Sequence, residues 1–186
     1  MKKFWIMATC VPLLVTLSAC DTTSPMASYS VLPANTLALQ GALKSKGATV
    51  KVGDVTKAAT VSDPHCRLAG ALDVTNGKTV EAYVKSALQA ELLAAQSYDV
   101  AAPTTINARL DQLDVNTVGD AAWTIGLTLT SNVNPTGYQV TSTYKFKTSF
   151  SAIAACQNAT SAFIPALQEA IGSGVSNAQF ATLITQ

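Results

Sequence analysis

Three successive stretches of this chain alternate apolar and polar residues, and they limit the possible folds more than any other feature. They span residues 105–115, 122–130 and 138–150. In the second stretch every other residue is apolar: Trp123, Ile125, Leu127 and Leu129. In the third, the apolar face holds Tyr138, Val140, Tyr144, Phe146 and Phe150. Because successive side chains of a strand point to opposite faces, this alternation predicts three strands with one buried and one solvated face.

Two amphipathic helices are predicted on either side of these strands. Residues 79–97 place an apolar residue at every fourth position: Val80, Val84, Leu88 and Leu92. In residues 151–171 a set of mostly apolar residues recurs at intervals of three or four: Ile153, Cys156, Thr160, Phe163, Leu167 and Ala170. Both spacings put these side chains on one helix face. Proline has no amide hydrogen, so Pro165 is expected to kink or split the second helix.

One further strand is predicted over residues 49–61. Val50 and Val52 share a face, but Val55 breaks the parity, which indicates a bulge at the Gly53-Asp54 pair. The element order is then strand, helix, three strands, helix. This order predicts an α+β fold, a two-layer sandwich with a mostly antiparallel sheet and two helices on one face. The first strand, the first helix and the second strand would form a parallel crossover.

The first nineteen residues predict a targeting segment. Lys2 and Lys3 precede a mostly apolar run from Trp5 to Leu17. This run is shorter than the roughly 20 apolar residues that cross a bilayer. A basic start, a short apolar run and small residues at its end are typical of a secretory signal peptide, which we assign to residues 1–19.

The end of this segment, Leu17-Ser18-Ala19-Cys20, resembles the bacterial lipobox. In lipoproteins with that motif, the signal peptide is cut just before the cysteine, which is then acylated. The resemblance implies palmitate-type lipid attachment at Cys20 and a membrane anchor; the alternative is an ordinary signal peptide with an incidental cysteine. Residues 20–34 would form a lipidated flexible tether. Residues 35–186 would form a single periplasm-facing domain, in which residues 35–46 fit either a short helix or irregular chain.

The sequence leaves open which membrane receives the protein. Asp21 directly follows the cysteine, and in enteric bacteria an aspartate there resembles an inner-membrane retention signal. That rule differs between bacterial groups, so both the inner and the outer membrane remain possible destinations.

Removal of the signal peptide changes the cysteine and charge balance. Apart from Cys20, the cysteines that remain are Cys66 and Cys156. In an oxidising envelope compartment such a pair predicts a disulfide, with two separate buried thiols as the alternative. Ten basic residues stand against eleven acidic ones in residues 20–186. With no concentrated basic patch to neutralise phosphates, we expect no nucleic-acid partner.

The element order, with "VEAYVKSALQAEL" and "YKFKTSFSAIAAC", resembles small uncharacterised envelope lipoproteins of Gram-negative bacteria. The layout is also similar to the YajG-like lipoproteins and to the lipopolysaccharide-assembly lipoprotein. The resemblance implies an accessory role in the envelope and supplies no catalytic residues to carry over.

Side chains that could carry chemistry are few. His65 stands beside Asp63 and Cys66, too small a set for a structural zinc site. We therefore expect no catalytic residues, metal or cofactor. The predicted function is a non-catalytic accessory or interaction module that contacts another envelope protein. Its alternatives are a module that binds lipid or a small apolar ligand, and a hydrolase using His65 and Cys66. A solvated strand face is one possible partner surface: Thr141, Thr143, Lys145 and Lys147.

Overall fold

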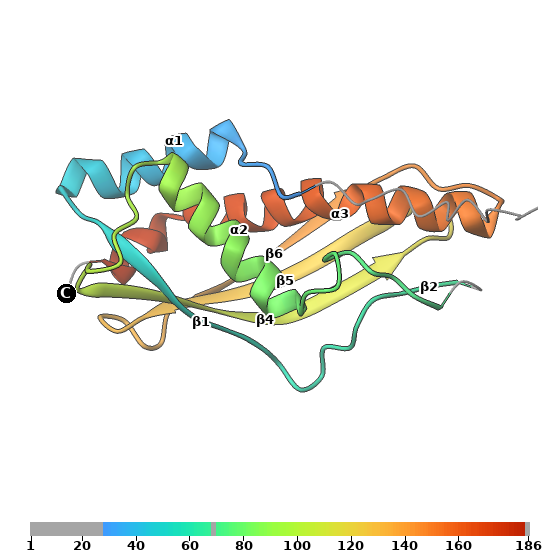
Figure 1. Ribbon diagram of the computed structural model, residues 1–186, viewed down its shortest axis with the longest axis horizontal. Coiled ribbons are helices and arrows are strands. Elements are labelled where there is room, and N and C mark those ends of the chain that lie inside the picture. The colour runs from blue at the N-terminus through green and yellow to red at the C-terminus, as the bar shows by residue number, and fades with distance from the viewer. Residues whose placement is uncertain (1–27, 68–69, 185–186) are drawn as a thin grey trace, which may run out of the picture.

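Helices and sheet form two layers, with the helices on one face of the sheet (Figure 1). The computed structural model describes residues 28–67 and 70–184. The α-helices in this part of the chain are α1 (Pro33–Leu43), α2 (Val80–Ala94) and α3 (Ala152–Val175). The predicted α+β two-layer sandwich is confirmed. Helix α1, followed by the 3-10 turn η1 (Lys44–Lys46), resolves the choice left open for residues 35–46.

Four strands make the main sheet: β1 (Val50–Lys57), β4 (Thr104–Asn116), β5 (Ala122–Ser131) and β6 (Tyr138–Lys145). Their order across the sheet is β1-β4-β5-β6. Strand β1 runs parallel to β4, with α2 between them in the chain, and β4, β5 and β6 pair antiparallel. The predicted parallel crossover and antiparallel strand series are therefore confirmed.

Two register shifts decide which side chains face the helices. Between Val52 and Val55 the pairing of β1 with β4 shifts, which confirms the predicted bulge. A second shift lies between Leu110 and Gln112, where β4 pairs with β5. It changes the buried parity of β4, so that Leu113 returns to the core at 5% exposure. Extra residues in one strand produce such shifts without breaking the sheet.

Hydroxyl side chains mark the start of the two long helices. The Thr79 hydroxyl accepts a hydrogen bond from the backbone N–H of Ala82 at 3.2 Å, and the Ser151 hydroxyl accepts one from Ala154 at 3.5 Å. Each cap satisfies a backbone donor that the first helical turn leaves unpaired. The cap residues thus fix where α2 and α3 begin.

Trp123 connects the sheet to α3 at the centre of the core. It is fully buried, and its indole Nε1–H donates to the backbone carbonyl of Ala159 at 2.8 Å. Its ring meets Phe163 edge-on, with centroids 5.2 Å apart. The predicted contact between the two apolar layers is confirmed, because one buried cluster contains members from the sheet and from both long helices: Trp123, Ile125, Leu127, Leu129, Val84, Leu88, Phe163 and Leu167.

Helix α3 continues through Pro165, so of the predicted kink or split the split is wrong. The carbonyl that loses its helical donor there belongs to Ser161, which is exposed. On either side of Pro165, Phe163 and Leu167 are each 1% exposed, and the burial of these two side chains stabilises the helix across the proline. Near the end of α3, a Cβ added at Gly174 would come within 2.8 Å of the Leu129 side chain. The helix therefore lies close against β5.

Two residues that the pattern assigns to the core are instead exposed. Strand β6 ends at Lys145, and Phe150 lies fully exposed in the connection to α3. Ile153 is 72% exposed. The buried face of α3 is centred on small residues, among them the fully buried Ala155 and Ala159. Ile171 lies on the same side of α3 five turns later and is 1% exposed, so Ile153 is exposed because it lies in the first turn of the helix and not because of its helix face.

Replacement of Trp123 tests the packing of the two layers. Trp123→Ala should lower the free energy of unfolding by roughly 3–5 kcal/mol, because it leaves a cavity between β5 and α3. Equilibrium denaturation with urea measures this change.

Two variants calibrate that measurement. Trp123→Phe keeps an aromatic ring but loses the donor to Ala159, so it should cost less than the alanine variant. Leu37→Ala, at a residue that is 68% exposed, should change stability by under about 0.5 kcal/mol. A Trp123→Ala protein as stable as Leu37→Ala would contradict the central position of this ring.

Candidate functional site

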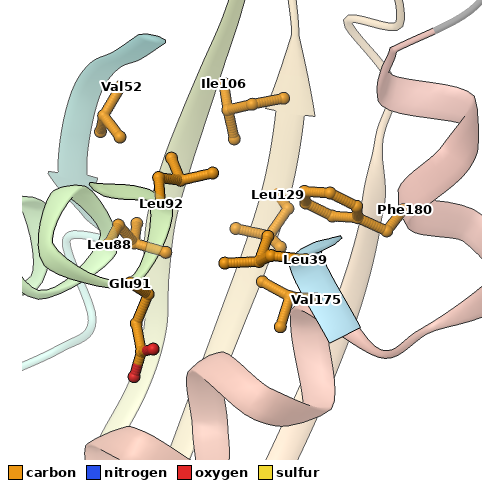
Figure 2. A pocket seen from close by; sticks show the side chains of 9 residues that line it. All are labelled: Leu39, Val52, Leu88, Glu91, Leu92, Ile106, Leu129, Val175 and Phe180. Carbon is orange, nitrogen blue, oxygen red and sulfur yellow. The ribbon is translucent and has the colours of Figure 1, made fainter. Parts of the chain in front are cut away.

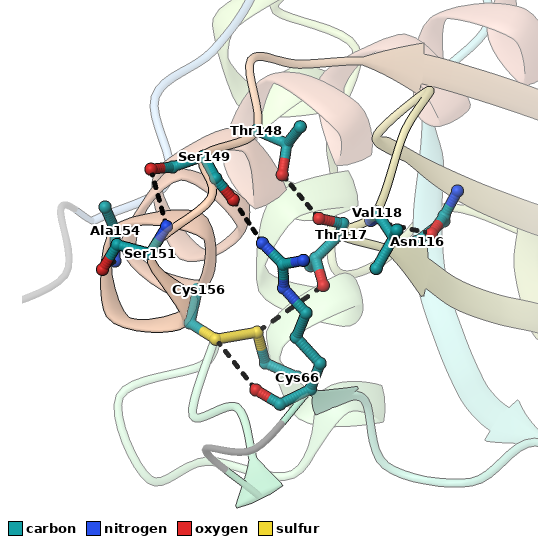
Figure 3. The surroundings of a disulfide bond; sticks show 10 residues. Cys66, Asn116, Thr117, Val118, Thr148, Ser149, Ser151, Ala154 and Cys156 are labelled. Atoms are coloured by element: carbon teal, nitrogen blue, oxygen red, sulfur yellow. Dashed lines mark hydrogen bonds between the residues drawn. A yellow bond between two sulfur atoms is a disulfide. The ribbon is translucent and has the colours of Figure 1, made fainter.

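Cys66 and Cys156 meet at one end of the sandwich (Figure 3). Cys66 belongs to β2 (His65–Cys66), which pairs with β3 (Gly70–Ala71) in a small hairpin that the sequence did not predict. Cys156 lies on α3, with its sulfur at bonding distance from that of Cys66. Their Cα atoms are 5.8 Å apart, within the usual range for disulfides. The pair joins residues 90 positions apart in the chain.

Two chain connections gather around this pair (Figure 3). The Thr148 hydroxyl, between β6 and α3, donates to the Thr117 carbonyl, between β4 and β5, at 2.5 Å. The Arg67 Nη2 group donates to the Ser149 carbonyl. We call this region the disulfide end; it comprises the following residues: Cys66, Arg67, 117–121, 146–153 and Cys156.

His65 does not form a nucleophile pair with Cys66. It is exposed, whereas Cys66 is 3% exposed, as expected for consecutive residues of a strand. The His65 Nδ1 atom lies 2.7 Å from the Asp63 carbonyl oxygen. The Asp63 carboxylate pairs with Lys57 at 3.0 Å. With its sulfur at bonding distance from Cys156, Cys66 offers no free thiol for attack.

An open groove of about 530 Å³ lies between residues 57–64 and residues 71–81. Of the charged residues that line it, Lys57, Asp63 and Asp73 are engaged locally, and Lys78 and Glu81 also line the groove. Asp73 accepts backbone hydrogen bonds from Thr75 and Gly77, which hold the pKa of its carboxyl below the usual value. Lys57 is paired with Asp63. Nothing in this groove assembles an acid, a base and a nucleophile.

A buried carboxylate attaches the N-terminal part of the described chain to the helix layer. Glu91 of α2 has no exposed surface, and its Oε1 atom accepts three hydrogen bonds. The donors are the Tyr29 hydroxyl at 2.6 Å, the Leu32 amide at 3.0 Å and the Asn35 side-chain amide at 3.1 Å. The Oε2 atom has no partner among the described residues.

Neighbouring contacts extend this attachment to α3. Asn35 Nδ2 also donates to the Gln168 carbonyl at 2.9 Å, and Gln168 Nε2 donates to the Ser30 carbonyl at 2.6 Å. Burial raises the pKa of the Tyr29 hydroxyl far above its usual value, and the hydrogen bond to Glu91 raises it further. Tyr29 therefore remains a donor at physiological pH. We call these residues the N-terminal clamp: Tyr29, Ser30, Leu32, Asn35, Glu91 and Gln168.

The N-terminal clamp is not predicted by the sequence pattern, which assigns residues 28–34 to the tether of residues 20–34. One signal was present: Glu91 follows Val84 by seven positions and Leu88 by three, so it falls on the apolar stripe of its helix. A carboxylate on such a stripe requires buried donors. Which residues supply them could not be derived, because Tyr29 lies 62 positions away in the chain.

The space between the layers is almost entirely filled. An apolar cavity of about 10 Å³ lies beside Leu92, Ile106 and Leu129 (Figure 2). This volume is at the lower limit for a single water molecule. Figure 2 shows the Glu91 carboxylate pointing away from these side chains, so its carbon stem lines the cavity. The described residues thus contain no preformed chamber here for a lipid chain.

The predicted partner surface is exposed on β6 and just beyond it. Thr141, Thr143, Lys145 and Lys147 are all exposed. Strand β6 is an edge of the main sheet, so one side of its backbone has no neighbouring strand among the described residues. Elsewhere on the outer face the polar groups bond to one another, as where Arg109 pairs with Asp111 at 2.6 Å. Such a face is stable in water and open to a partner.

The predicted lipid-attachment residue, Cys20, lies outside the described residues. Within residues 28–67 and 70–184, no helix combines the length and apolarity needed to cross a bilayer. The same residues include no group of three or more His, Cys, Asp or Glu side chains placed to hold a metal ion.

No family model matches the chain, and no curated protein matches it. Among solved structures it is similar to protein XCC0632 from Xanthomonas campestris, of the family model DUF330, with a TM-score of 0.52 and 10% identity. The match covers 72% of this chain and 85% of that chain. A crystal structure of an uncharacterized protein matches with a TM-score of 0.34 and 9% identity, over 66% of this chain and 90% of that chain. The likeness to XCC0632 shows a shared fold.

The chemical state of the cysteine pair can be measured directly. Protein recovered from cells should resist thiol alkylation at Cys66 and Cys156 until it is reduced, as mass spectrometry can show. Cys156→Ser should then lower the free energy of unfolding by about 2–4 kcal/mol, because the unfolded chain loses a long covalent loop. Alkylation of both residues without prior reduction would rule the disulfide out.

The N-terminal clamp makes a separate prediction. Glu91→Ala removes the acceptor shared by three donors and should destabilise the protein by about 3 kcal/mol. Hydrogen–deuterium exchange should accelerate first in residues 28–35. Glu169→Ala, at an exposed glutamate of α3, is the matched control and should change neither quantity. Unaltered exchange in Glu91→Ala would show that other contacts hold this segment.

Proposed function

We propose that this protein is a membrane-anchored envelope lipoprotein that acts as a non-catalytic accessory or interaction module. The observation that carries the proposal is the lipobox-like sequence Leu17-Ser18-Ala19-Cys20 after a short apolar run with a basic start. Its acyl chains would hold the domain at the periplasmic side of the inner or the outer membrane. Two or more acyl chains anchor a protein stably.

Two features of the structure support this proposal. Cys66 and Cys156 lie at bonding distance, and structural disulfides belong to oxidising compartments such as the periplasm. The N-terminal clamp attaches the chain to the helix layer only nine residues after Cys20, at Tyr29. A lipid on Cys20 would therefore keep the folded domain within a few tens of ångströms of the bilayer, at about 3.5 Å per residue.

The interaction role is supported by what the folded domain presents to solvent. The outer face and free edge of β6 offer backbone groups together with threonine and lysine side chains to a partner. A tether raises the local concentration of partners on the same membrane, so that modest affinity suffices. The filled core gives little support to the ligand-binding alternative, and the engagement of Cys66 gives none to a cysteine hydrolase.

One in-cell experiment tests both parts of the proposal. A photo-crosslinking residue is placed at Thr143, and cells are fed a palmitate analogue. The protein with Cys20 intact should carry the label and crosslink to a specific envelope protein. Cys20→Ala should lose the label, and its crosslinked yield should fall at least about tenfold because the local concentration is lost.

A crosslinker at Leu93, an exposed residue on α2, is the positional control and should not capture the same protein. Equal label in the Cys20→Ala variant would eliminate the lipoprotein assignment. Robust hydrolytic turnover that His65→Ala abolishes would replace the accessory role by an enzymatic one.

A further inference from the structure

Three large apolar side chains are exposed together at the disulfide end. Phe150 is fully exposed, Ile153 is 72% exposed and Val118 is 56% exposed. They come from the β6–α3 connection, the first turn of α3 and the β4–β5 connection, respectively. The hydrogen bond from Thr148 to Thr117 holds the two connections side by side (Figure 3).

Other exposed apolar side chains are distributed over separate elements. Leu37 lies on α1, Leu93 at the end of α2, and Val100 in the connection from α2 to β4. Val100 belongs to the opposite end of the sheet, because its neighbour Tyr98 bridges to Val50 at the start of β1. Single exposed apolar residues are common, whereas a group of them marks an interaction site. The disulfide end is such a group.

The chain approaches α1 from the side of the disulfide end. Helix α1 leads toward the start of β1, so residues 28–32 lie at its other end, over α3 (Figure 1). There the Ser30 carbonyl accepts a hydrogen bond from the Gln168 side chain. Gln168 follows Ile153 by fifteen residues, which is about 22 Å along helix α3. The ten residues from Cys20 to Ser30 reach about 35 Å when extended. The tether is long enough to bring Cys20 past the first turn of α3.

Charge at this end also suits a phospholipid surface. Lys145 and Lys147 are exposed next to the apolar group, and Asp120 is an exposed acid on the same end. The Arg67 guanidinium is bound to a backbone carbonyl beside them. Cations near the surface are attracted to anionic lipid headgroups, so the excess of basic side chains favours contact with a bilayer.

We propose that the disulfide end docks on the phospholipid bilayer that receives the lipid on Cys20. Phe150, Ile153 and Val118 enter the headgroup region, where apolar side chains gain from leaving water. This inference rests on the proposed acylation of Cys20. It adds an orientation of the domain on the bilayer. The end that carries Val100 would stand roughly 40 Å from the bilayer, because strand β4 is about that long at about 3.3 Å per residue.

Tryptophan quenching tests the orientation. Acylated Phe150→Trp and Val100→Trp proteins are placed in vesicles of phosphatidylethanolamine and phosphatidylglycerol that carry bromine on their acyl chains. Trp123, the one tryptophan of residues 20–186, is buried and supplies the same background in both variants. After that background is subtracted, quenching should be at least about twofold stronger at position 150 than at position 100.

A second pair, Ile153→Trp and Leu37→Trp, repeats the comparison at two exposed helical positions and guards against a local disturbance at Phe150. The mass of the acyl chains on Cys20 is measured first. Equal quenching at both ends of acylated protein overturns the docking and leaves the lipoprotein assignment intact. A blue shift at position 150 that also occurs without vesicles assigns this end to a second copy of the chain instead. Absence of acyl mass overturns both proposals.

Discussion

Burial of one face of the β1-β4-β5-β6 sheet under helices is the constraint on which the rest of this structure depends. A sheet with one apolar face cannot leave that face in water, and Trp123 at its centre contributes more apolar area than any aliphatic neighbour. Its indole N–H donates a hydrogen bond to a backbone carbonyl of α3, so the polar group of this buried ring has a partner. Small residues on α3, from Ala155 to Gly174, let the helix approach the sheet closely enough to make these contacts.

Much of this arrangement could be predicted, because alternation in a strand records which face is buried. The parity of Trp123 to Leu129 was right, and the parity break after Val52 located a real bulge. Helix α2 was likewise predicted by its four-residue spacing. These are local signals, since each element must hide its own apolar face whatever lies opposite.

Errors arose where packing between distant segments overrides a local rule. Pro165 does not split α3, because buried neighbours on both sides hold the helix and the lost hydrogen bond falls at an exposed position. Phe150 continues the apolar pattern of β6 beyond the point where the strand has a partner, so parity assigned it to a core that ends earlier. Ile153 misled for a related reason: it lies in the first turn of α3, whereas Phe163, Leu167 and Ile171 further along the helix are buried. The N-terminal clamp joins three segments far apart in the chain, and spacing within one segment cannot reveal it.

Helix α3 connects the disulfide end with the N-terminal clamp, the two regions involved in the proposed anchoring. Cys156 fixes its first half to the β2–β3 hairpin, and Gln168 in its second half holds Ser30. A flexible tether limits only the distance between domain and bilayer and leaves the orientation free. Here Gln168, which holds Ser30 where the tether enters the domain, and Ile153 of the exposed apolar group lie on one helix, about 22 Å apart. An anchored domain therefore presents the apolar group at high local concentration to the bilayer, and even weak insertion suffices to select one orientation, with Thr141 and Thr143 of β6 left free for a protein partner.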